Sequence, residues 1–190
     1  KNLPTADSGM ICFKDKKDDK LARQLSWLGI DKDTYSRSDK GSYKWKYDVP
    51  NIGFKYHGNS IMAAMGIVQL KYLDEDNDVR NKIAEGYKKE LKNIQCIKPD
   101  LYVKKCSYHL FQIRVPAIQR EKILDTLYKK DIYPGVHYID NTTYPMYNEY
   151  YGKCPNAHKA SNELITLPIH LGITQEDIKR ISNIINKVVK

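Results

Sequence analysis

The sequence lacks the long apolar runs and paired cysteines that mark membrane-spanning and zinc-binding proteins. None of its 190 residues belongs to a run approaching the roughly 18 to 20 apolar residues that cross a bilayer. Its four cysteines are scattered, without a Cys-x-x-Cys pair, so they predict no metal site. Unpaired cysteines are typical of reduced thiols, and we expect a cytoplasmic protein.

The positive charge has no pattern typical of nucleic-acid recognition. The chain carries 32 Lys and Arg against 23 Asp and Glu, a formal net charge of +9. Its lysines are spread over the whole sequence, with no Arg-rich arm or aromatic-interleaved RNA motif. Nucleic-acid binding is therefore an unlikely alternative. With 41% hydrophobic and 29% charged residues, the composition favours a globular chain with a core.

The first third of the sequence predicts a strand, a helix and a long loop. Residues 9–14 form a short apolar run suited to a buried strand. Residues 21–28 keep leucines at helical spacing, and Gly29 is expected to end that helix. Residues 30–52 show no sustained periodicity and predict a loop.

The middle of the sequence predicts helix with two different patterns. From Asn59, a suitable N-cap, to Leu73 the residues are apolar nearly all round, which predicts burial on more than one side. Residues 74–91 are instead charged, with apolar residues four apart, as in an exposed amphipathic helix. We place a domain boundary at residues 73–76.

The last part of the sequence alternates strand and helix signals, which predicts an α/β or α+β domain. Thr174 with Asp177 predicts a capping box at the start of a final helix. The expected strands lie at 109–115, 134–138 and 164–167, and the other helices at 118–130 and 156–162.

Short sequence blocks occur in a fixed order along the chain. They are KNLPTADSG at 1–9, WLGIDKD at 27–33, GFKYHGNSIMAAMGIVQL at 53–70, YHLF at 108–111, GVHY at 135–138 and LPIH at 167–170. Together they resemble the DegT/DnrJ/EryC1/StrS sugar aminotransferases, which are pyridoxal-phosphate enzymes of fold type I. The resemblance covers nearly the whole chain.

The resemblance implies an α/β chain that is one part of a larger enzyme. Residues 1–76 would belong to the large, cofactor-binding domain, and 77–190 would form the C-terminal small domain. In the family, the segment before the lysine supplies most of the cofactor pocket, and that segment is not in this sequence. We therefore expect the chain to be inactive by itself.

The resemblance assigns the Schiff-base lysine to Lys1, which would bind the cofactor aldehyde and shuttle a proton. The plainer alternative is an ordinary basic residue. Relatives that act as dehydratases carry histidine at this position, so Lys1 argues against that branch. Lys55 and His57 would reach the cofactor phosphate of a neighbouring subunit, which implies a homodimer. His57 stands where the family has Asn or Arg, and it could instead pack at a helix start.

His137, Tyr138 and His170 are the expected substrate-binding residues, because the family carries its GVHY and LPLH blocks on the active-site side. Each histidine could equally be a hydrogen-bonded structural residue. The tyrosine-rich stretch 133–151 could line a sugar site or form a half-buried loop. His158 has the character of a plain surface residue.

The expected reaction converts a keto group on a nucleotide-linked deoxysugar to an amine, with glutamate or glutamine as donor. The basic net charge would suit the anionic diphosphate of such a substrate. The alternatives are a non-catalytic regulator or scaffold of the same fold and, less favoured, a basic nucleic-acid-binding domain.

Overall fold

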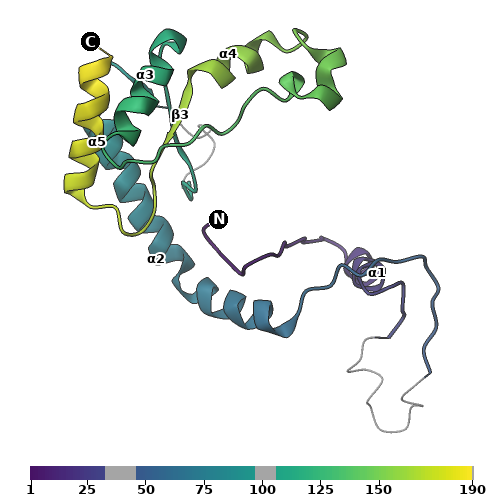
Figure 1. The fold of residues 1–190 in the computed structure, drawn as a ribbon. Helices are drawn as coiled ribbons and strands as arrows, with labels where there is room; N and C mark the ends of the chain where they lie inside the picture. Colours follow the sequence, from purple (N-terminus) through teal and green to yellow (C-terminus); the bar gives the residue numbers. More distant parts are fainter. Residues whose placement is uncertain (33–45, 97–105, 190) are drawn as a thin grey trace. The chain divides into compact units, whose positions relative to one another are not determined.

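The computed structural model describes residues 1–32, 46–96 and 106–189, which contain both helices and a small sheet (Figure 1). The chain divides into two compact units. Unit 1 consists of Lys1–Asn2 with Tyr72–Lys190, and unit 2 consists of Leu3–Lys71. This mixed content of helix and strand agrees with the α/β class expected from the sequence.

Unit 1 contains a three-stranded antiparallel sheet in the order β1-β2-β3. The strands are β1 (Gln95–Cys96), β2 (Phe111–Arg114) and β3 (Leu164–Leu167). Two of the predicted strands, at 109–115 and 164–167, are thereby confirmed, whereas the short β1 was not anticipated. The pairing register opposes Phe111 to Leu167 and Ile113 to Ile165, which places four apolar side chains on one face.

The strand predicted at 134–138 is wrong in its extent. Only Gly135 pairs with the sheet, as an isolated bridge to Thr166. Pro134 has no backbone N–H to donate to a ladder, so regular pairing cannot extend through it.

The helices follow the apolar periodicity closely. They are α1 (Lys16–Ser26), α2 (Ser60–Glu90), α3 (Ala117–Tyr128), α4 (Pro155–Glu163) and α5 (Gln175–Val188), with 3-10 turns η2 (Asn141–Thr143) and η3 (Pro145–Tyr150). The predicted caps are confirmed. The side chain of Asn59 accepts from the N–H of Met62 at 3.0 Å, and Thr174 with Asp177 forms a reciprocal capping box.

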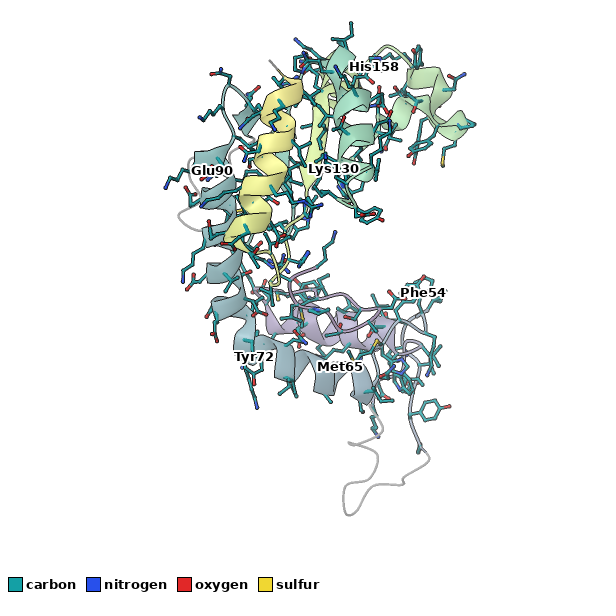
Figure 2. The ribbon with its side chains drawn as sticks, turned by 60° about the vertical axis from the view of Figure 1, so that its left-hand side comes forward. Phe54, Met65, Tyr72, Glu90, Lys130 and His158 are labelled. Atoms are coloured by element: carbon teal, nitrogen blue, oxygen red, sulfur yellow. The ribbon has the colours of Figure 1, made fainter. Side chains whose placement is uncertain are left out.

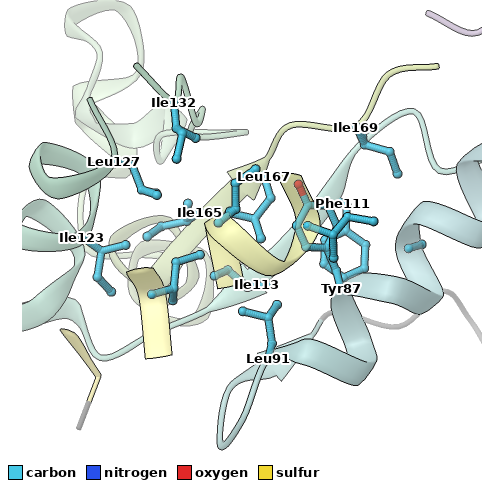
Figure 3. Packing of buried hydrophobic residues seen from close by; sticks show 14 of the residues in the cluster. Tyr87, Leu91, Phe111, Ile113, Ile123, Leu127, Ile132, Ile165, Leu167 and Ile169 are labelled. Atoms are coloured by element: carbon cyan, nitrogen blue, oxygen red, sulfur yellow. The ribbon is translucent and has the colours of Figure 1, made fainter. Parts of the chain in front are cut away.

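A hydrophobic core fills unit 1 between the sheet and helices α2, α3 and α5 (Figure 3). Tyr87 from α2 stacks on Phe111 from β2, with ring centroids 5.1 Å apart. The apolar residues that the periodicity of α2 and α3 placed on the inner face are buried: Ile83, Tyr87, Leu91, Ile123, Leu124 and Leu127. Spacing alone therefore predicted which faces of these two helices point inward.

Unit 2 contains α1 and the first part of α2, and Gly29 ends the turn after α1 as predicted. Gly29 has φ +76°, and its N–H donates to the carbonyl of Gln24 at 2.8 Å. The strand predicted at 9–14 is wrong, because these residues pair with no described strand and Met10 is 91% exposed. An apolar run forms a buried strand only where it can pair with a neighbouring strand of a sheet.

The prediction that the helix from Asn59 to Leu73 is buried on several sides is also wrong for this chain. Ile61 is 76% exposed and Leu70 is 62% exposed. Met65, on the same helix, is 41% exposed (Figure 2). Only one stripe, which includes Met62 and Gly66, is half-buried, since the described part of unit 2 packs against a single side of the helix.

One helix runs through both patterns of the middle region. α2 continues without a break across residues 73–76. The boundary between the two units along the chain falls between Lys71 and Tyr72. No proline or glycine lies between Gly66 and Gly86, so nothing in the sequence interrupts the helix there.

Candidate functional site

Lys1 is held in unit 1 through its neighbour Asn2. The side-chain amide of Asn2 donates to Oδ1 of Asn77 at 2.8 Å and to the backbone carbonyl of Ser107 at 2.6 Å. Asn77 lies on α2, and Ser107 belongs to the segment leading into β2. Two hydrogen bonds from one amide therefore fix the backbone next to the predicted catalytic lysine.

A second asparagine extends this arrangement along α2. The Asn81 amide donates to the backbone carbonyl of Asn77 at 2.7 Å and to that of Cys106 at 2.8 Å. Asn77 and Asn81 are one helical turn apart and so share a face. Sequence reasoning missed them, although two asparagines four residues apart on an otherwise charged helix were a visible signal.

His109 is a site residue that sequence reasoning quoted in its block but did not single out. The pKa of its imidazole lies below the ordinary value, first because partial desolvation disfavours the charged form. Electrostatic interactions with Lys1 and with the other basic groups His137 and Arg80 add to this effect. The structure thus brings the predicted lysine and one predicted histidine into electrostatic reach of the same imidazole.

His137 is positioned by both long strands of the sheet. Its Nδ1 lies 2.9 Å from Oγ1 of Thr166, and Gln112 donates to its backbone carbonyl. Gln112 and Thr166 face each other across β2 and β3, on the face opposite the apolar pairs. A Cβ at Gly135 would lie 2.6 Å from the His137 ring, so any other residue here would displace that ring.

The segment before His170 is anchored to α2. Arg80 donates through Nη1 to the carbonyl of Ile169 at 2.8 Å. The hydroxyl of Tyr87 donates to the carbonyl of Pro168 at 2.9 Å. These two bonds from one helix fix the backbone on which His170 stands.

The side chains of His170 and Tyr138 are more open than that of His137. Nδ1 of His170 accepts from the N–H of Gly172 at 3.3 Å. Tyr138 is 65% exposed, and its ring centroid lies 5.0 Å from that of His137. Both residues therefore keep polar atoms accessible to a ligand.

Lys55 and His57 belong to unit 2, where they meet around Trp27. Nζ of Lys55 lies 3.7 Å from the centroid of the Trp27 ring. The His57 ring stands edge-on to the same indole, with centroids 4.1 Å apart. The structure therefore brings these two predicted phosphate-binding residues together, around a tryptophan that the sequence reasoning did not name.

His158 is more than the plain surface residue expected from its sequence neighbours. Its Nδ1 lies 3.2 Å from Oδ2 of Asp140, and the other carboxylate oxygen, Oδ1, accepts from the backbone N–H and the hydroxyl of Thr142. These hydrogen bonds, the backbone bond first, hold the pKa of Asp140 below its ordinary value. The arrangement orders the middle of the tyrosine-rich stretch, at whose two ends Tyr133 and Tyr151 are exposed.

Neither a metal centre nor a membrane span occurs in the part of the chain that the structure describes. Within residues 1–32, 46–96 and 106–189, no three histidine, cysteine or acidic side chains are arranged to hold a metal ion. In the same ranges, no helix combines the length and apolar character needed to cross a bilayer. The candidate site consists of lysine, histidine, asparagine and arginine groups.

The family model of the DegT/DnrJ/EryC1/StrS aminotransferase family matches residues 1–186. The chain therefore belongs to this family. The match begins at Lys1 and extends through all the blocks noted in the sequence.

Solved structures and curated proteins agree with this assignment. The aminotransferase TlmJ of Streptoalloteichus hindustanus is 27% identical with a TM-score of 0.83, over 99% of this chain and 49% of that one. Spr1654 of Streptococcus pneumoniae, a proposed sugar aminotransferase in its PMP form, is 26% identical with a TM-score of 0.82, over 100% of this chain and 50% of that one.

An uncharacterized protein of Methanocaldococcus jannaschii is 30% identical over 200 aligned residues, which cover all of this chain and 51% of that protein. The chain thus spans about half the length of the relatives that it matches.

Proposed function

We propose that the complete protein is a pyridoxal-phosphate-dependent aminotransferase of fold type I that aminates a keto group on a nucleotide-linked deoxysugar. Glutamate or glutamine would be the amino donor. In this proposal residues 1–76 belong to the cofactor-binding domain and residues 77–190 to the small domain. Support comes from the family membership and from the likeness to Spr1654, which has been solved in PLP and PMP forms.

The observation that carries the proposal is the placement of Lys1. The side-chain hydrogen bonds of Asn2 hold the neighbouring Lys1 in the unit that contains His137, and there the charge of Lys1 helps to lower the pKa of His109. A primary amine beside imidazole groups can serve as a nucleophile and exchange protons, as transamination requires.

The residues present suit the chemistry of pyridoxal phosphate. When bound, this cofactor supplies an aldehyde for a lysine amine and a ring that withdraws electrons from the reacting carbon. Lys1 provides the amine, and once released its Nζ can move the proton at the α-carbon of the donor. Lys55 provides a cationic donor for a phosphate and His57 can provide a ring N–H, and their indole neighbour has a buried N–H without an acceptor among the described residues.

His137, Tyr138 and His170 are proposed to bind the sugar substrate. His137 is fixed by Thr166 and by Gln112, so its remaining ring nitrogen has a defined direction. Tyr138 offers an exposed aromatic face and a hydroxyl, the combination that sugars commonly contact. Substitution of these residues should raise KM more than it lowers kcat if they bind ground state and transition state alike.

A homodimer is part of the proposal. Lys55 or His57 of one chain would approach the cofactor phosphate of its partner, giving two equivalent sites, each built from both chains. The exposed apolar residues of α2 in unit 2 supply a surface suited to such burial. A monomeric complete protein with ordinary cofactor affinity would contradict this part.

Lys1→Ala in the complete protein tests the activity. The substitution should abolish both transamination and the visible absorbance band of covalently held cofactor, since it removes nucleophile and proton carrier together. Lys14→Ala, a matched change at an exposed lysine of the same segment, should alter neither. Circular dichroism should show the same fold in all three proteins.

The same experiment separates the alternatives. A complete protein that never develops the cofactor band would support a regulator or scaffold of this fold. A band that persists in Lys1→Ala would show that the lysine is misplaced. Nucleic-acid binding with a steep dependence on salt concentration would support the basic-domain alternative.

A further inference from the structure

We propose that Trp27 is a positioning residue that holds Lys55 and His57 as one preordered pair of hydrogen-bond donors for a phosphate monoester. The inference rests on the proposed role of that pair in binding the cofactor phosphate. It adds a residue to which neither the family match nor the sequence motifs gave a role.

The backbone brings both Lys55 and His57 to Trp27. Trp27 and Lys55 form an antiparallel bridge, and the carbonyl of Ser26 accepts from the N–H groups of Tyr56 and His57 at 2.9 and 3.1 Å. The side chains of Lys55 and His57 both contact the indole. Tyr56, which lies between them in the sequence, instead stacks on Phe54 with ring centroids 5.1 Å apart.

Two glycines fix the distance between these backbone segments. A Cβ at Gly29 would lie 1.8 Å from the carbonyl oxygen of Asn51, and one at Gly53 would lie 2.0 Å from the nitrogen of Gly29. No other residue fits at either place without moving the backbone. The turn after Trp27 and the segment before Lys55 therefore cross at a close, defined separation.

The indole restricts both side chains. The Lys55 ammonium, 3.7 Å from the ring centroid, lies within the range of a cation–π interaction. A lysine side chain loses considerable rotamer freedom when it binds an anion, and a lysine already held over a ring loses less. The edge-on contact at 4.1 Å restricts the His57 ring in the same way.

The indole N–H gives an independent indication of a polar ligand. Nε1 of Trp27 is buried and has no hydrogen-bond partner among the described residues. A buried donor without an acceptor is unfavourable, and an anion oxygen beside Lys55 and His57 would satisfy it. Lys55, His57 and this N–H lie at one indole. A phosphate has several acceptor oxygens and can accept hydrogen bonds from all three.

The test compares pyridoxal phosphate with pyridoxal, which lacks the phosphate, as ligands of the complete protein. Trp27→Leu and Trp27→Met should each weaken the binding of pyridoxal phosphate roughly tenfold. The binding of pyridoxal should be unchanged, since only the phosphate contacts Lys55 and His57. Trp27→Phe should restore most of the affinity because it retains an aromatic face. Tyr56→Leu, at a neighbouring residue that stacks on Phe54, is the control and should change neither affinity.

A combined variant separates this inference from the proposed function. The double variant Lys55→Ala with His57→Ala should weaken the binding of pyridoxal phosphate and not that of pyridoxal. Adding Trp27→Leu to this variant should then have little further effect on either affinity. If the double variant weakens the binding of pyridoxal phosphate and the Trp27 substitutions do not, the positioning role of Trp27 is wrong, whereas the proposed phosphate site is supported. If the double variant retains normal affinity, the proposed phosphate site itself is wrong, and the inference with it.

Discussion

The two units have similar apolar content but differ in how much of it they bury. Unit 1 buries apolar residues from α2, β2, α3, β3 and α5 in one core, and several of them, such as Ile113 and Ile165, are 0% exposed. In the described part of unit 2, only Thr5 and Gly29 are buried, while Ile61 and Ile67 lie exposed. An apolar helix thus predicts that some surface covers it. Which surface does so is visible only where the helix packs against a core, as in unit 1. We propose that the rest of the protein or a second subunit covers unit 2.

The largest expected effect contrasts a core residue with an exposed one. In the 190-residue chain, Ile113→Ala should lower the free energy of unfolding by about 2–5 kcal/mol, because it removes buried methyl groups and leaves a cavity. Ile61→Ala, at a residue 76% exposed, should change it by less than about 0.5 kcal/mol. Urea denaturation measures both, and equal effects would contradict the contrast between the units.

The same pair of substitutions in the complete protein sharpens the comparison. If other parts of the protein cover α2, Ile61→Ala should there cost about 1–3 kcal/mol or weaken the dimer. An unchanged denaturation midpoint and an unchanged oligomeric state would show that this face stays exposed in the complete protein as well.

Two helix caps provide a second contrast. Thr174→Ala removes the capping box of α5, which packs in the core, and should cost roughly 0.5–2 kcal/mol of unit 1 stability. Asn59→Ala removes one cap bond at the start of α2, outside the core. It should increase amide exchange in the first turn of α2 without lowering the stability of unit 1. Hydrogen exchange followed by mass spectrometry distinguishes these outcomes.

The hydrogen bonds of Asn2 allow a smaller and more local test. Asn77→Ala removes the side-chain acceptor at 2.8 Å and should weaken the anchoring of Lys1–Asn2 by about 0.5–1.5 kcal/mol. Amide exchange at residues 2–3 should rise up to about tenfold, with the thermal midpoint little changed. Asn77→Asp keeps an acceptor oxygen and should retain slow exchange. Faster exchange in both variants would show that the bond has no anchoring role.

The smallest expected effect concerns pH. The pKa of Asp140 is lower in the folded chain than its ordinary value near 3.8, mainly through hydrogen bonds from Thr142. Its ionised form therefore stabilises the fold above that ordinary pKa, and this stabilisation is lost as pH falls through the lower folded pKa. Asp140→Asn should flatten the decline of the urea midpoint between about pH 5 and pH 2. An unchanged slope would show that Asp140 does not couple folding to pH.

Local sequence patterns predicted many elements of this chain. The periodicity of residues 118–130 and 164–167 was sufficient for α3 and β3, because helix and strand place side chains at fixed intervals. The Thr174 and Asn59 caps were predictable because their bonds join residues within one turn. The blocks from Lys1 to His170 were also sufficient to recognise the family that the comparison confirmed.

Contacts between residues distant in sequence required the tertiary structure. No local pattern joins Asn2 to Asn77 and Ser107, His137 to Gln112 and Thr166, or Trp27 to Lys55 and His57. The same limit explains two of the wrong predictions, the strand at 9–14 and the buried helix from Asn59. The sequence by itself determined the helical segments and the apolar runs, because those properties depend on neighbours along the chain. Only the tertiary structure decided which of them are buried and which side chains meet, because burial and contact depend on what packs against a segment in space.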